Sequence, residues 1–241
     1  HTPFGHCGED ELNLKMKKYG GFDHNFQALK ILMFLEKKYL NFDGLNLTFE
    51  TLDGILKHNG PVLLKIPKYL KSFVNHFESD LSSYGSLESQ ISSICDDIAY
   101  DNNDIDDGLY ANFFTLDDLE ELDLVKTVLS NIKIKNSSNI KRLKYELVRN
   151  LIKLMIDDLI NNTRSNLKRL KIKSPDDIEN CGVRIVKFSN FMKKEEEKLK
   201  KFLRNKMYSH PKIKAMNIKS KKIISDLFDL FVNEPELIQK K

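Results

Sequence analysis

The chain has 241 residues, of which 41% are hydrophobic and 31% are charged. This balance predicts a soluble globular protein with a proper core and excludes a disordered chain. No apolar stretch reaches the roughly 18 residues that a membrane span needs, and nothing resembles a signal peptide. Three cysteines without a CxxC pair argue against a disulfide framework or a zinc ribbon, so we expect reduced thiols and a cytoplasmic protein.

The net charge of +4 hides an asymmetry between the two halves. Residues 1–130 hold 11 Lys and Arg against 22 Asp and Glu, whereas residues 131–241 hold 28 against 13. A basic half can attract phosphates or nucleic acid. The alternative is that the lysines lie on solvated helix faces. Without a dedicated nucleic-acid motif, we favour solvated faces over nucleic-acid binding.

Apolar periodicity predicts an all-α protein. We expect helices over residues 24–39, 48–57, 66–77, 87–100, 116–132, 140–170, 189–207 and 218–232. Thr48 is a candidate N-cap, and Asn59-Gly60-Pro61 is a typical helix stop. Residues 173–182 read as a loop. Residues 183–188 are the best candidate for a strand, which predicts at most a small β-hairpin.

The chain opens with the run His1-Thr-Pro-Phe-Gly-His6-Cys-Gly-Glu9. Pro3 and Gly5 predict a tight turn that points His1 and His6 into one cavity. Glu9 is close enough along the chain to orient the His6 imidazole. A histidine held by a carboxylate can act as a general acid near neutral pH. A purely structural turn and cap is the alternative.

A second cluster is the acidic run from Asp96 to Gly108. On a helix Asp96, Tyr100 and Asp104 fall within about 80° of one face. Two aspartates and a phenol on one stripe can bind a metal and a sugar hydroxyl. The spacing of an EF-hand loop is absent. An exposed acidic helix end is the alternative.

His24 follows Gly20-Gly21-Phe22-Asp23 and opens a long amphipathic helix. A histidine at that position is often a cap or a core residue rather than a catalytic group. The residue alone leaves both interpretations open.

Taken together, these runs resemble the HD-domain deoxynucleoside triphosphate triphosphohydrolases, the bacterial dGTPase-like proteins. The run at the start matches the family pattern with Thr2 in place of a proline. Further blocks follow in the family's order over nearly the whole chain: residues 20–29, 43–48, 54–60, 96–108, 202–211 and 227–231. Several ordered blocks are far more specific than any one of them.

The resemblance implies a single all-α HD-type domain over residues 1–241, with a C-terminal helical portion from about 174. It implies hydrolysis of a deoxynucleoside triphosphate to a deoxynucleoside and triphosphate, and a homo-oligomer. His1 would contact the substrate phosphate, and Tyr100 and Asp104 would face the deoxyribose. His6, supported by Glu9, would protonate the leaving 5′ oxygen. His24 would be its supporting or catalytic partner.

The resemblance also implies one divalent metal ion, with Mn²⁺ or Mg²⁺ favoured. Its ligands would be a histidine, a His-Asp pair and a distant aspartate, which Asp96 matches. The first three would lie before residue 1, so we expect an N-terminally truncated chain whose activity is incomplete or absent. One carboxylate does not retain a catalytic ion. The alternative is a catalytically silent regulatory or oligomerisation subunit; an HD hydrolase acting on another phosphoester is less favoured.

Overall fold

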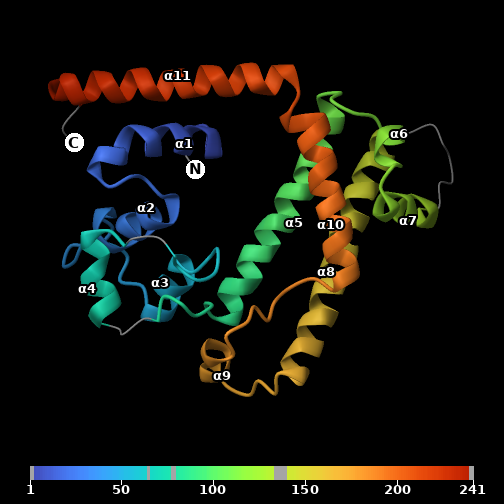
Figure 1. Ribbon diagram of the computed structural model, residues 1–241, viewed down its shortest axis with the longest axis horizontal. Helices are drawn as coiled ribbons and strands as arrows, with labels where there is room; N and C mark the ends of the chain where they lie inside the picture. The colour runs from blue at the N-terminus through green and yellow to red at the C-terminus, as the bar shows by residue number, and fades with distance from the viewer. Residues whose placement is uncertain (1–2, 64–65, 77–79, 133–139, 239–241) are drawn as a thin grey trace. The chain divides into compact units, whose positions relative to one another are not determined.

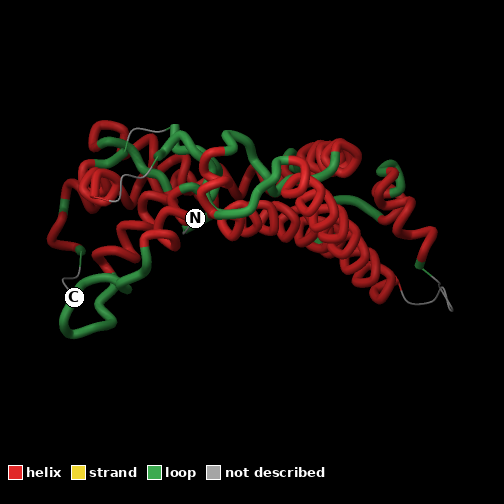
Figure 2. Tube along the Cα trace, turned by 90° about the horizontal axis from the view of Figure 1, so that it is seen from below, coloured by secondary structure: helices red, strands yellow, loops and turns green. Residues whose placement is uncertain are grey.

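The computed structural model describes residues 3–63, 66–76, 80–132 and 140–238. Within these ranges every regular element is helical, and Figure 2 shows helices joined by loops. The all-α prediction is therefore confirmed. The candidate strand over residues 183–188 is an irregular segment and forms no hairpin. Across the described ranges, no helix is long and apolar enough to cross a membrane.

Contacts divide the chain into two compact units, residues 1–82 with 211–241 and residues 83–210. The predicted single domain over residues 1–241, with its portion from residue 174, stays a prediction, since a compact unit is not by itself an independently folding domain.

The first unit joins the two ends of the chain. Its helices are α1 (Gly5–Met16), α2 (His24–Lys30), α3 (Phe49–Leu56), α4 (Lys68–His76) and α11 (Pro211–Asn233), with short helical turns η1 (Lys17–Tyr19), η2 (Ile31–Leu35) and η4 (Pro235–Leu237). α1 lies along α11 (Figure 1). The Cys7 thiol donates to the Asn217 carbonyl oxygen at 3.3 Å, and Lys15 pairs with Asp229 at 2.6 Å. α11 thereby supports the helix that carries the opening motif.

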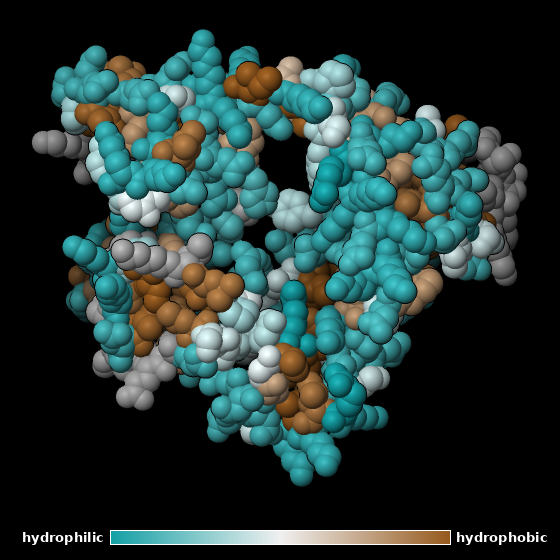
Figure 3. All heavy atoms as spheres, in the orientation of Figure 1, coloured by the Kyte–Doolittle hydropathy of each residue, from teal (hydrophilic) through white to brown (hydrophobic). Residues whose placement is uncertain are grey.

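A small apolar core holds the rest of this unit together. Its buried members come from α2, α3 and α4, and they are Phe26, Leu29, Leu52, Leu56, Leu70 and Phe73. Figure 3 shows apolar side chains gathering over α3 and α4 on an otherwise mainly hydrophilic face. The core anchors α2, and with it the position of His24 at the start of that helix.

The second unit is built on long helices. It contains α5 (Leu87–Tyr110), α6 (Leu116–Leu119), α7 (Asp123–Asn131), α8 (Ile140–Arg169), α9 (Pro175–Asn180), α10 (Asn190–Leu203) and the turn η3 (Arg204–Tyr208). α5 packs against both α8 and α10 (Figure 1). α8 buries Leu147, Leu151, Met155 and Leu159 at four-residue spacing, the pattern of one helix face. Each such side chain contributes about 1.5–3 kcal/mol by leaving water.

Several predicted helices differ from the structure in extent. The helices predicted over residues 87–100 and 218–232 are longer than predicted, because they belong to α5 (Leu87–Tyr110) and α11 (Pro211–Asn233). The helix predicted over residues 24–39 ends at Leu35, because the chain turns back and the Leu45 N–H donates to the Leu32 carbonyl at 2.8 Å. The helix predicted over residues 116–132 is interrupted after Leu119 and resumes at Asp123. Thr48 occupies the N-cap of α3 as predicted, but its side chain makes no capping bond to the backbone.

The loop predicted over residues 173–182 was wrong in part, because α9 lies within it. Ser174 accepts a hydrogen bond from the Asp177 N–H, and the Asp177 side chain accepts one from the Ser174 N–H. Pro175 fits the first turn of a helix, where its missing N–H costs nothing. Ser-Pro-Asp-Asp is therefore a helix start, and the reciprocal capping pattern is the signal that identifies it.

Candidate active site

The turn between α1 and α2 positions the first group of site residues. Gly20 and Gly21 both have left-handed backbone angles, with φ of +106° and +84°. Glycine adopts these angles without the steric cost that other residues carry. The turn is fixed by the Phe22 N–H, which donates to the Asn13 side-chain oxygen at 2.9 Å. The chain therefore reverses, and the start of α2 lies against α1.

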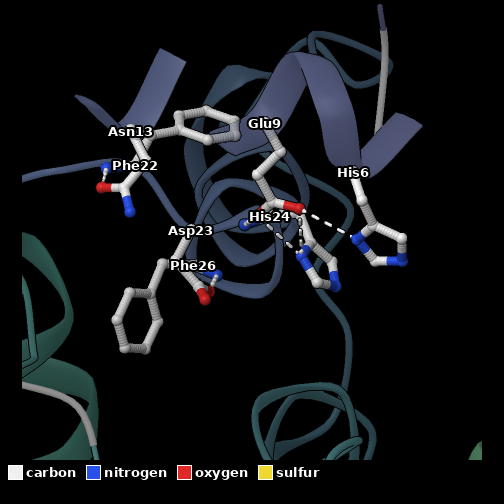
Figure 4. Close-up of polar contacts among 7 residues, drawn as sticks. All are labelled: His6, Glu9, Asn13, Phe22, Asp23, His24 and Phe26. Carbon is white, nitrogen blue, oxygen red and sulfur yellow. Dashed lines mark hydrogen bonds and ion pairs between the residues drawn. The ribbon is translucent and has the colours of Figure 1, made fainter. Parts of the chain in front are cut away.

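Glu9 and His24 meet at this reversal (Figure 4). The His24 ring nitrogen Nδ1 lies 2.8 Å from Glu9 Oε1 and 3.1 Å from Oε2. The His24 backbone N–H donates to the same Oε1 at 2.8 Å. A single carboxylate thus holds both the ring and the first amide of α2. Two contacts with Glu9 orient the imidazole, and a third holds the backbone of His24.

The electrostatics of Glu9 favour its ionised form. Partial burial raises the pKa of Glu9, but hydrogen bonds from the His24 ring and backbone and the nearby His6 outweigh it, and the net pKa is lowered. An ionised carboxylate accepts hydrogen bonds only, so His24 Nδ1 is the donor. The proton that a histidine exchanges in catalysis is then handled at Nε2.

His6 lies at the edge of this pair. Its Nδ1 is 3.6 Å from Glu9 Oε2, and its ring centroid is 6.2 Å from that of His24. The His6 side chain is 74% exposed, whereas that of Glu9 is 14% exposed. The structure therefore brings together His6, Glu9 and His24. The shortest Glu9 contacts go to His24 rather than to His6, and His1 lies outside the described residues.

Asp23 joins the cluster without having been singled out from the sequence. One ligand atom each of Glu9, Asp23 and His24 lies within 4.8 Å of the others. The Asp23 carboxylate caps α2 by accepting from the Phe26 N–H at 3.0 Å, and Glu9 holds His24. These donors have structural partners, so we derive no metal role for them. The signal for Asp23 was its position just before a predicted helix.

The second group of predicted residues lies on α5 in the other unit. Asp96 and Tyr100 are exposed there, and Asp104 is partly buried. The Tyr208 hydroxyl, from η3, donates to Asp104. Burial and the neighbouring Asp107 raise the pKa of Asp104, and the bond from Tyr208 opposes the rise. Tyr208 was not assigned a role from the sequence; its block of family resemblance was the available signal.

Asp101 is the most perturbed acid of α5. Its residue is 5% exposed, and its Oδ2 has no hydrogen-bond partner among the described residues. Burial raises the pKa of Asp101 to about 7, even though Lys200 opposes the rise. Desolvation favours the neutral form of a carboxyl group in this way.

An all-α scaffold carrying a histidine held by a carboxylate has the means for general acid–base catalysis.

Residues 186–241 match the phosphohydrolase-associated domain. The chain is 40% identical over 243 residues to a deoxyguanosinetriphosphate triphosphohydrolase-like protein of Caulobacter vibrioides, covering 99% of this chain and 62% of the relative. Proteins with the same name from Bartonella henselae and Brucella suis are 42% and 41% identical, with 99% of this chain and 61% of each relative covered.

The chain is therefore similar to the dGTPase-like HD-domain phosphohydrolases over nearly its whole length, as its ordered motifs predicted. It spans about three fifths of the length of these curated relatives.

Replacing Gly8 by alanine is expected to destabilise the first unit. A Cβ at Gly8 would overlap the backbone oxygen of Pro3, so the turn before α1 would have to move. Relieving such an overlap costs about 1–3 kcal/mol. Helix propensity alone predicts the opposite, a gain of about 0.5–1 kcal/mol for Gly8→Ala. Urea denaturation followed by circular dichroism measures the sign of the change in unfolding free energy. A stabilised variant would contradict the close approach of Gly8 to the Pro3 backbone oxygen.

Proposed function

We propose that this chain carries part of the active site of a metal-dependent deoxynucleoside triphosphate triphosphohydrolase. The observation that carries the proposal is the His6–Glu9–His24 cluster, in which one carboxylate orients a histidine next to a second histidine. The curated relatives support the substrate class through their name. The products would be a deoxynucleoside and intact triphosphate.

The proposed reaction needs a proton at a defined atom. Water attacks the α-phosphorus and releases a proton to solvent, a new P–O bond forms, and the bond from phosphorus to the 5′ oxygen breaks. The leaving oxygen must take up a proton to become the 5′-hydroxyl. A positioned general acid contributes about 10²–10⁴-fold to such a step. We assign this proton to His6, which is accessible, and assign to His24 the role of the partner that Glu9 holds in place.

The second set of residues fits recognition of the sugar. Asp104 and Tyr100 lie one helical turn apart on α5, and the Tyr208 hydroxyl holds the Asp104 carboxylate. Such a pair offers a hydroxyl and a carboxylate to a deoxyribose hydroxyl. We therefore propose that Tyr100 and Asp104 bind the sugar, with Tyr208 orienting Asp104.

The proposed metal rests on the family resemblance. A divalent ion, Mn²⁺ or Mg²⁺, would polarise the α-phosphate and activate water. Asp96 is its proposed ligand in this chain. Among the described residues, no group of three potential ligands includes Asp96, and a catalytic site for such an ion needs several protein ligands. We therefore derive no step through the ion.

His6→Ala is expected to reduce the release of triphosphate from dGTP by about 10²-fold or more. The assay uses Mn²⁺ and two proteins. One is the 241-residue chain, and the other is the Caulobacter vibrioides relative with its matching part replaced by this chain. Full activity of the His6→Ala variant in an active parent would contradict the assigned role. A panel of other deoxynucleotides then gives the base preference.

The alternative is a catalytically silent regulatory or oligomerisation subunit. It predicts no turnover by either protein, together with a mass that changes when nucleotide is added. Light scattering with and without dGTP measures that mass. A constant mass and no nucleotide binding would count against this alternative.

A further inference from the structure

A polar pocket of about 280 Å³ lies beside the C-terminal part of α8 in the second unit. It is lined by Asn162, Asn166, Arg169, Lys187, Phe188 and Asn190. None of these residues belongs to the candidate active site, and no role follows for them from the proposed reaction. The pocket therefore needs its own explanation.

Hydrogen bonds join the two walls of the pocket. Asn162 Nδ2 donates to the Lys187 carbonyl oxygen at 2.7 Å, and Asn166 Nδ2 donates to the Ile185 carbonyl oxygen at 2.9 Å. Asn166 is 6% exposed and Phe188 is 7% exposed. These contacts tie α8 to the segment that precedes α10. A site whose walls are already fixed loses little entropy when a ligand binds.

The pocket carries two positive charges. Arg169 donates to the Asn166 side-chain oxygen at 3.3 Å. Across the described ranges neither Arg169 nor Lys187 forms an ion pair, and no carboxylate lines the pocket. Asp158, four residues before Asn162 on α8, accepts hydrogen bonds from the Ser189 N–H and hydroxyl at 2.9 and 2.6 Å and is outside the lining. The pocket thus presents two cations that form no ion pair in the described ranges.

We propose that this pocket binds the phosphate group of a phosphorylated small molecule. The arginine fork matches two phosphate oxygens, and the lysine adds a compact charge. The Asn190 amide, at the start of α10, can donate a further hydrogen bond. Free phosphate, triphosphate and a nucleotide share this chemistry. The volume leaves room for more than one phosphate group.

The test compares two double variants that remove the same charge. Arg169→Gln with Lys187→Gln changes the pocket. Arg164→Gln with Lys168→Gln removes two exposed cations from the same stretch of α8, outside the lining. Titration calorimetry of the whole chain with inorganic phosphate, triphosphate and dGTP, in EDTA, measures binding without turnover. We expect the pocket variant to bind about tenfold or more weakly and the control variant to change by less than about twofold.

The outcomes separate the sources and the proposals. If the pocket variant loses the binding of phosphate and triphosphate, the pocket is an anion site. If it loses only the binding of dGTP, the pocket is a nucleotide site. An equal effect of both double variants, or no pocket-dependent binding of any of the three probes, overturns the proposal. Circular dichroism confirms that each variant is folded. The experiment measures binding and not hydrolysis. Its result can therefore be interpreted even if the chain does not hydrolyse dGTP.

Discussion

The Asp101→Asn variant is expected to be more stable than the parent chain above pH 7 and nearly equal to it near pH 4. Asp101 has an ordinary pKa of 3.8, which burial raises to about 7 in the folded chain. A group whose folded pKa is raised stabilises the fold fully below its unfolded pKa and loses that contribution as the pH rises through the folded value. Each pKa unit corresponds to about 1.4 kcal/mol, so the loss reaches at most about 4 kcal/mol.

The groups around Asp101 set the direction of this effect. Lys200 on α10 favours the ionised form, whereas Glu196 on the same helix and Asp97 and Asp104 on α5 oppose it. The unpartnered Oδ2 adds to the cost of ionisation. An asparagine has nearly the same shape and does not ionise, so it removes the pH-dependent part alone.

Urea denaturation of the parent and the variant at pH 4, 6 and 8 measures this difference. Asp106→Asn, on the same helix, is the control for the loss of one carboxylate from α5. A difference between parent and Asp101→Asn that stays constant with pH would contradict a neutral Asp101.

Helices were predictable from the sequence where a periodic apolar face decided them. Apolar residues from Leu147 to Leu159 recur every four positions in the sequence, and the structure buries them on one face of α8. The end of the helix at Leu35 depends instead on the Leu45 N–H, which lies beyond the helix along the chain. The pattern of apolar residues within the helix does not indicate such a contact. Propensity cannot locate a boundary that tertiary structure sets.

The candidate site was predictable to the extent that its residues lie close together in the chain. Glu9 and His24 are 15 residues apart, and both lie in blocks of the chain that resemble the family. The bond from Tyr208 to Asp104 spans 104 residues, and no local pattern predicts it. Asp101 stands in an acidic run that reads as exposed. Its burial follows from the packing of α5 against α10, which the sequence does not show directly.

Glu9→Gln is expected to lower the rate of triphosphate release by about 10²-fold or more while leaving the fold intact. The glutamine keeps an oxygen acceptor for the His24 amide but loses the charge that holds the His24 ring. Glu9 holds His24, the proposed partner of His6, and its Oε2 also lies 3.6 Å from His6 Nδ1. Losing the charge should therefore misplace the proposed general acid as well as its partner, and a misplaced or mis-protonated imidazole transfers its proton poorly. The rate is measured in the chimaera with the Caulobacter vibrioides relative.

A second readout tests the same residue without catalysis. The pKa of Glu9 is lowered in the folded chain, because the His24 bonds outweigh the effect of burial. Its stabilising contribution is therefore present above the ordinary value of 4.5 and is lost as the pH falls through the lower, folded value. Glu9→Gln should remove this part of the acid sensitivity. Asp10→Asn neutralises the adjacent, exposed carboxylate of α1 and should leave the rate close to that of the parent. If Asp10→Asn lowered the rate as strongly as Glu9→Gln, the general charge of α1 would be responsible, and the specific hold of Glu9 on His24 would be refuted.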